Sequence, residues 1–168
     1  GQPRNRIGRL HADGALDTDF NPDADDLVRS LAVQTDGRIV IGGVFSLLAG
    51  QARSRIGRLN HDGSLDLTFD PGADAEVMSL AIQTDGRILV GGRRFTALGG
   101  ESRNSIGRVT SGAAALQILE IDSSGTTVSW RRSGAGPEVA QVSFEISFDE
   151  TNYASLGIGR RVSGGWEI

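Results

Sequence analysis

Short hydrophobic runs separated by polar turns dominate the first two thirds of the chain. The run SLAV at 30–33 is followed, after a polar turn, by RIVIGG at 38–43. Apolar runs of this length that are rich in β-branched residues are typical of strands, and their nearly continuous apolar character predicts that both faces are covered. No stretch shows sustained helical periodicity. The pattern therefore predicts an all-β protein.

Turn residues divide these runs into hairpins. Asp36-Gly37 and Asp62-Gly63 each lie between two apolar runs, and Asp-Gly favours a tight hairpin because both residues tolerate positive φ. The paired glycines Gly42-Gly43 predict a place where neighbouring backbones approach closely. We predict strands at 27–34, 38–43, 55–60, 64–69, 77–83, 87–92 and 105–109.

This pattern of strands and turns recurs along the chain as a sequence repeat. QTDGRIVIGG at 34–43 returns as QTDGRILVGG at 83–92, and the segment at 4–25 matches that at 53–74. A third partial copy, RNSIGRV, stands at 103–109. The repeated unit is therefore 49 to 50 residues long. A four-stranded antiparallel meander that recurs at this period describes a blade of a β-propeller.

The copies predict an incomplete propeller. Residues 1–112 would hold half a blade at 4–20, a whole blade at 27–69 and a partial blade at 77–109. A propeller normally closes with at least about four blades, so the end faces of this set would stay open. Two explanations remain: the chain is a fragment of a longer array, or several chains assemble to complete one.

Residues 113–168 follow a different pattern. Val142, Phe144, Ile146 and Phe148 alternate with polar residues, as expected of a strand with one buried face. Trp130 and these strands resemble part of a fibronectin type III or immunoglobulin-like sandwich, which needs roughly 100 residues. The alternative is a small β extension that packs on the last blade and supplies its missing outer strand.

The repeat also resembles a known family. IGRLNHDGSLDLTFDPGAD, followed by VMSLAIQTDGRILVGGRRF, is similar to the bacterial delta-60 repeats, which are tandem and propeller-like. The resemblance implies long arrays in large proteins that are secreted or attached to the bacterial cell surface. It brings no catalytic residues to this chain, and the sequence predicts no cofactor apart from the calcium considered below.

Charge and composition exclude several classes of function. The 17 basic residues are all arginines, they are dispersed, and the formal net charge is −4, whereas a nucleic-acid-binding domain carries a concentrated basic surface. The absence of cysteine excludes disulfides and thiolate metal sites. No apolar run approaches the roughly 20 residues of a membrane span. We therefore expect neither nucleic-acid binding nor a membrane span.

One acidic stretch, DTDFNPDADD at 17–26, raises the possibility of calcium binding. An EF-hand loop requires glycine and glutamate where this chain has Pro22 and Val28, so that motif fails. A weaker calcium site and a solvated acidic turn both remain open. The calcium candidates are Asp17, Asp19, Asp23, Asp66 and Asp70.

Most other charged residues return in every copy. An active site is needed once, so we interpret the recurring Asp and Arg residues as turn formers and as Arg–carboxylate pairs between strands or blades. No catalytic constellation is found among the residues that do not recur. Arg93 and Arg94 interrupt the repeat in a loop after a strand, and we predict a contact surface there.

These observations favour a non-enzymatic repeat module of a secreted or cell-surface protein. It would act as a scaffold or as an adhesion-type surface for a protein or glycan ligand, and its blades would contact neighbouring blades or further copies of the chain. The alternative is a glycan-active propeller hydrolase or lyase whose site lies in blades outside this chain.

Overall fold

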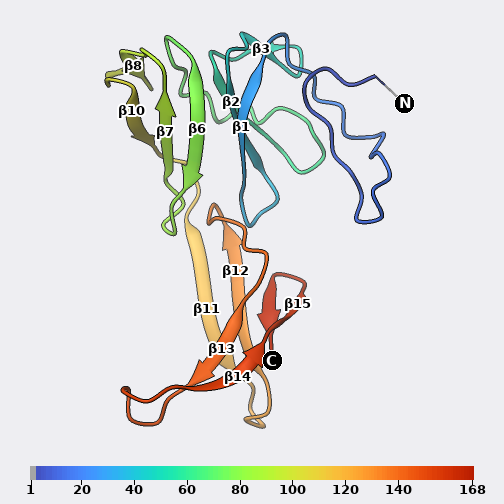
Figure 1. Cartoon of the computed structure of the whole chain (residues 1–168), viewed down its shortest axis with the longest axis vertical. Coiled ribbons are helices and arrows are strands. Elements are labelled where there is room, and N and C mark those ends of the chain that lie inside the picture. The colour runs from blue at the N-terminus through green and yellow to red at the C-terminus, as the bar shows by residue number, and fades with distance from the viewer. Residues whose placement is uncertain (1–2) are drawn as a thin grey trace.

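The computed structural model describes residues 3–168, which form β-strands and turns without any helix. Figure 1 shows two small sheets side by side at one end of the molecule and a long hairpin that leads away from them to the C-terminal strands. All strand pairs are antiparallel, and no sheet of the described residues closes into a ring. The all-β prediction is confirmed.

Each repeat unit contributes a three-stranded sheet. The first blade has the order β1-β2-β5 and the second has the order β10-β7-β6. A two-residue hairpin that the sequence did not predict lies within each blade, β3 with β4 and β8 with β9. The bounds are β1 Val28–Val33, β2 Ile39–Gly43, β3 Leu47–Leu48, β4 Gln51–Ala52, β5 Ile56–Leu59, β6 Val77–Ile82, β7 Ile88–Gly92, β8 Ala97–Leu98, β9 Glu101–Ser102 and β10 Ile106–Val109.

The Asp-Gly hairpins are confirmed, with one difference in the turn. The Gly37 amide donates to the Gln34 carbonyl at 2.9 Å, and the Gln34 amide donates to the Arg38 carbonyl at 2.8 Å. Only the glycine has positive φ, 80° at Gly37, whereas Asp36 does not. The loop is therefore a turn followed by a left-handed glycine, which is the usual three-residue hairpin connection.

The predicted fourth strand at 64–69 is wrong. This segment makes a single bridge between Leu59 and Leu65. Directly afterwards, Asp66 Oδ1 accepts hydrogen bonds from the amide and hydroxyl of Thr68, at 2.9 and 2.6 Å. An aspartate that binds the backbone two residues further on forms a turn, which takes the chain out of the ladder.

Two buried clusters cover the two faces of the first blade. Val40 and Ile41 are neighbours on β2 but belong to different clusters, because successive side chains of a strand point to opposite faces. The cluster between the blades consists of Val40, Ile56, Phe69, Ala73, Val77, Ile88, Val90, Phe95 and Leu98. The cluster that joins the first blade to the preceding segment consists of Ile7, Phe20, Ala24, Ile41, Phe45, Leu48 and Leu59.

The outer faces of the two blades are open. Ile56 is fully buried, whereas Ile106 at the same repeat position is 67% exposed, and Leu89 is 37% exposed where its equivalent Val40 is buried. Leu31 on β1 is 53% exposed. The prediction that both faces of the first two strands are covered is therefore confirmed for β2 and wrong for β1. The exposure of Ile106 and Leu89 agrees with the prediction that the end faces of this set of blades stay open.

The paired glycines lie where backbones approach closely, as predicted. A Cβ atom added at Gly42 would be 2.5 Å from Val77 Cγ1 of the next blade. A Cβ atom at Gly43 would be 2.1 Å from the Leu27 carbonyl oxygen. Any side chain at either position would therefore separate these segments.

The C-terminal residues form an open sheet. The order is β11-β12-β16-β15, and β13 pairs separately with β14. The large apolar side chains of β11 are 54–67% exposed, so the described residues do not form a closed sandwich. Phe144 is buried, but Phe148 is 94% exposed because β13 ends before it. The bounds are β11 Ala115–Ile121, β12 Val128–Gly134, β13 Ser143–Ile146, β14 Ala154–Ile158, β15 Arg160–Val162 and β16 Gly165–Glu167.

This extension attaches to the first blade and does not supply an outer strand for the second. The Thr35 amide donates to the Gly136 carbonyl at 2.8 Å, and the Glu138 amide donates to the Val33 carbonyl at 3.1 Å. The alternative in which the extension supplies the missing outer strand of the last blade is therefore wrong, although Ala135 does lie against Gly86 of that blade. The end of β1, an edge strand, offers unpaired backbone groups, which recruit another extended segment.

The stacking of blades predicts a contrast between two alanine substitutions. Ile56→Ala should lower the free energy of unfolding by about 2–4 kcal/mol because it leaves a cavity between the blades. Ile106→Ala, at the open position, should change it by less than about 0.5 kcal/mol. Urea unfolding monitored by circular dichroism gives the free energy of unfolding of each variant. Equal decreases for the two variants would contradict this stacking of the blades.

Candidate functional site

An ion pair fixes the last segment of the first repeat unit to its sheet. Arg58 Nε and Nη2 each lie 2.9 Å from Asp66 Oδ2, and both side chains are almost fully buried. The bridge between Leu59 and Leu65 places these two residues opposite each other. The Arg58 guanidinium also lies over the Phe69 ring, 4.6 Å from its centroid, a favourable cation–π distance.

The preceding unit repeats this arrangement. Arg9 Nε and Nη2 each lie 2.7 Å from Asp17 Oδ2, and the guanidinium carbon is 4.3 Å from the centroid of the Phe20 ring. The predicted Arg–carboxylate pairs are thus confirmed at these positions. We refer to each such set as a staple: Arg9, Asp17 and Phe20 form one, and Arg58, Asp66 and Phe69 form the other.

The staples keep their carboxylates ionised. The hydrogen bond from Arg9 lowers the pKa of Asp17. Burial acts to raise the pKa of Asp66, but hydrogen bonds from Thr68 and the charge of Arg58 outweigh it, and the pKa is lowered. A carboxylate in this state does not donate a proton near neutral pH, so neither aspartate has the protonation of a general acid.

Arg58 also joins segments that are distant in the sequence. Its Nη1 donates to the Ser111 carbonyl at 2.7 Å and to Gln34 Oε1 at 3.3 Å. Ser111 follows the second blade, and Gln34 directly follows the first strand of the first blade. Every guanidinium nitrogen of this buried arginine therefore has a partner, as a buried charge requires.

The second blade has the arginine of the staple without its partners. Arg108 occupies the position of Arg58, and its one described side-chain hydrogen bond is a long contact of 3.5 Å to Gln83 Oε1. Leu116 and Leu119 stand at the spacings where the other units have aspartate and phenylalanine. Both lie on β11, which belongs to the C-terminal sheet and leads away from the blades. The staple of this blade is incomplete.

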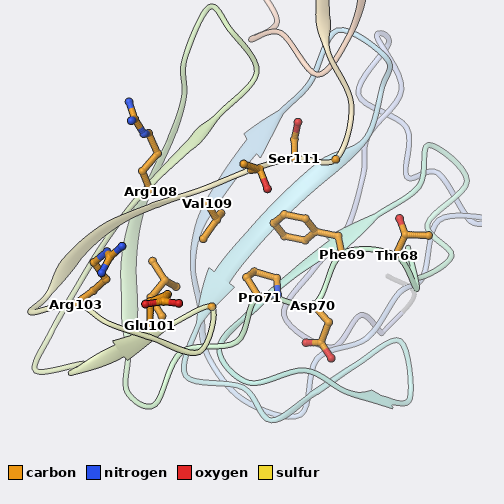
Figure 2. A pocket seen from close by; sticks show the side chains of 13 residues that line it. Thr68, Phe69, Asp70, Pro71, Glu101, Arg103, Arg108, Val109 and Ser111 are labelled. Atoms are coloured by element: carbon orange, nitrogen blue, oxygen red, sulfur yellow. The ribbon is translucent and has the colours of Figure 1, made fainter.

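An open pocket of about 430 Å³ lies beside Arg108. Figure 2 shows Phe69 and Pro71 on one side of it and Arg103 and Arg108 on the other. The pocket combines an apolar floor with charged groups at its rim. Its lining residues are Thr68, Phe69, Asp70, Pro71, Leu98, Gly99, Glu101, Arg103, Arg108, Val109, Thr110, Ser111 and Gly112.

The structure separates the calcium candidates. Asp17 and Asp66 are held by arginines in the staples, and Asp70 lies 3.5 Å from Arg53 Nη1. Asp23 has a positive φ of 46° in the segment before β1, and Asp19 donates its amide to Asp17 Oδ1. Within residues 3–168, no three His, Asp or Glu side chains gather in a way that could hold a metal ion.

The predicted contact surface does not coincide with the pocket. Arg93 and Arg94 are exposed in the loop between β7 and β8 and do not line it. Arg94 has a positive φ of 60°, where the first blade has one residue fewer. Sequence reasoning missed the pocket itself. The sequence signal that could have revealed the pocket is that Arg108, the third copy of the arginine, is not followed by aspartate and phenylalanine at the usual spacings.

Stacked antiparallel sheets, Asp-Gly hairpins and recurring staples define a β-propeller-type repeat protein. The chain belongs to the family described as "Domain of unknown function (DUF5122) beta-propeller", whose model matches residues 1–20, 34–69 and 83–112, about half of the chain. No curated protein and no solved structure matches it. Nor do the described residues contain a helix with the length and hydrophobicity to cross a bilayer.

The lowered pKa of Asp66 predicts a loss of stability in acid. A carboxylate whose pKa is lower in the folded state stabilises the fold above its ordinary pKa of about 3.9, and this contribution disappears as the pH falls through the folded value. The free energy of unfolding should therefore decrease below about pH 4. Asp25 and Asp122, each with a pKa lowered to about 2 by hydrogen bonds from Ser46 and Ser124, extend the decrease to lower pH.

The contribution of Asp66 can be isolated with one substitution. Asp66→Asn should reduce the difference in unfolding free energy between pH 6 and pH 3, because asparagine does not titrate. Glu145→Gln, at an exposed position on β13, is the matched control. Urea unfolding at each pH gives the values, and an Asp66→Asn variant with the full acid dependence would show that the staple does not cause it.

Proposed function

We propose that the chain is a non-enzymatic repeat module that serves as a scaffold and presents a binding surface. The observation that carries this proposal is the shared use of charged side chains in successive units. Arg9 with Asp17 and Arg58 with Asp66 make the same contacts at nearly the same distances. Groups that recur in this way hold the architecture together, and a ligand is then bound where the units differ.

The clearest difference between the units is the loop that carries Arg93 and Arg94. Both side chains are exposed, and arginine favours contacts with carboxylates and with the planar or hydroxylated faces of ligands. We propose a protein or glycan as the ligand of this loop. The resemblance of the repeats to the delta-60 family supports a secreted or surface-attached bacterial protein as the setting.

A propeller hydrolase or lyase acting on glycans is the other function considered. Such an enzyme needs carboxylates that are available to the substrate. Asp17 and Asp66 are engaged by arginines, so the site of such an enzyme would have to be formed by other residues or other blades. The proposal therefore favours binding over catalysis for this part of the protein.

A binding experiment with recovery of the ligand distinguishes the two functions. The full chain is immobilised and exposed to a panel of oligosaccharides and surface proteins, and retained ligands are eluted for mass analysis. Arg93→Ala combined with Arg94→Ala should weaken retention about tenfold, the effect of losing about 1.4 kcal/mol of contact energy. Arg131→Ala combined with Arg160→Ala, which removes two exposed arginines elsewhere, is the control of equal charge.

The state of the eluted ligand decides the class of function. A binding module releases its ligand intact. Shortened glycan that accumulates in proportion to protein concentration and time would contradict the non-enzymatic proposal. If both double variants retain the ligand equally well, the loop that carries Arg93 and Arg94 is not part of the binding surface.

A further inference from the structure

In the first blade, the position equivalent to the pocket beside Arg108 is occupied by the chain's own segment 63–69, called here the filling segment. Gly63 at the start of that filling segment contacts Phe20, with an added Cβ at 3.0 Å from the ring. Leu65 bridges Leu59, and Asp66 pairs with Arg58. One repeat unit later, Phe20, Leu59 and Arg58 correspond to Phe69, Val109 and Arg108, which all line the pocket.

A second pair of equivalent arginines, Arg53 and Arg103, supports the equivalence of the filled position and the pocket. Arg53 Nη1 donates to the carbonyl of the preceding residue at 2.7 Å, and its Nη2 donates to the Asp66 carbonyl at 3.4 Å. Arg103 makes the first of these contacts, to the Ser102 carbonyl at 2.6 Å. It lines the pocket at the position from which Arg53 reaches the filling segment.

The chain itself does not fill this pocket in the second blade. After Gly112 it enters β11, whose Leu116 and Leu119 are 57% and 67% exposed. The pocket therefore keeps the apolar floor, which includes Phe69 of the preceding unit, and the arginine of a staple, but it lacks the aspartate and the phenylalanine that its own unit would supply. Among the described residues, neither Asp70 nor Glu101 on the rim forms an ion pair with Arg108, and Asp70 lies instead 3.5 Å from Arg53 Nη1.

We propose that this pocket binds an extended peptide segment of a partner polypeptide that carries aspartate three residues before phenylalanine. The aspartate would receive two hydrogen bonds from Arg108, and the phenylalanine would lie against the guanidinium face, as in the two complete staples. Addition of a segment to an open sheet, with side chains seated in pockets, is an established mode of peptide recognition. This inference is independent of the Arg93 and Arg94 loop and of any ligand bound there.

A peptide taken from the chain itself tests the proposal. A fluorescein-labelled peptide with the sequence of residues 60–74, NHDGSLDLTFDPGAD, is titrated with the full-length chain, and binding is followed by fluorescence anisotropy. We expect saturable binding that weakens at least about tenfold with Arg108→Ala, because one charge-assisted pair is lost. Arg131→Ala, an exposed arginine in the C-terminal extension, should leave the affinity unchanged.

Two altered peptides identify the groups that are recognised. The peptides with Asp66→Asn and with Phe69→Ala should each bind at least about tenfold more weakly than the parent peptide. No saturable binding of the parent peptide up to millimolar concentrations would overturn the proposal. Equal affinity for the Arg108→Ala variant and the unaltered chain would overturn it as well.

The source of the segment is tested separately by sedimentation of the unlabelled chain. A chain that binds the peptide and yet stays monomeric at all concentrations supports a separate partner, because both of its own Asp-x-x-Phe segments are already bound within their units. Self-association that Arg108→Ala abolishes would overturn the choice of a separate partner and would assign the segment to a second copy of the chain. The Arg93 and Arg94 loop is unchanged in every variant, so failure here does not bear on the ligand proposed for that loop.

Discussion

The buried guanidinium of Arg58 is the constraint on which the first blade depends. A charge with 2% of its side chain exposed is tolerated only when a carboxylate and further acceptors surround it. Asp66 supplies the carboxylate, and Gln34 and Ser111 supply the other acceptors. These three partners come from the end of a unit, the end of its first strand and the exit of the next blade. One side chain therefore sets the positions of three separate segments.

The blades form a row in which each unit contacts its immediate neighbours, as in other repeat proteins. This arrangement gives the same residue different environments. Ile56 is buried between blades, whereas Ile106 is exposed at the open end. Arg58 is enclosed by its own unit and by Ser111 after the next blade, whereas Arg108 lines a pocket. The unpartnered members of the repeat are therefore where contacts with other molecules can form, and the enclosed members maintain the fold.

Much of the architecture could be predicted because repetition separates structural residues from the rest. The Asp-Gly turns, the close approach at Gly42-Gly43 and the pairs Arg9–Asp17 and Arg58–Asp66 all follow from residues that return at a fixed spacing. The predicted strand at 64–69 failed because its apolar pattern does not show that Asp66 binds Thr68 and turns the chain.

The features that depend on long-range contacts could not be derived from local pattern. The C-terminal extension attaches to the end of β1 through the Thr35 amide and through the side chains of Gln34 and Thr35. The acceptors are backbone carbonyls, which any residue carries, so the sequence does not show where these donors bind. The pocket is defined by what Arg108 lacks, namely an aspartate and a phenylalanine at the spacings found after Arg58. Such an absence becomes meaningful once the complete staples show what normally occupies the position.

A double-mutant cycle on Arg58 and Asp66 tests most directly whether their ion pair holds the first blade together. Arg58→Met, Asp66→Asn and the double variant are compared with the unaltered chain by urea unfolding at neutral pH. Each single substitution should cost about 3 kcal/mol because it leaves a buried group without its partner. The double variant should cost less than the sum by about 1–3 kcal/mol, which is the coupling of residues in direct contact. Strictly additive losses would contradict the claim that the staple holds the blade together.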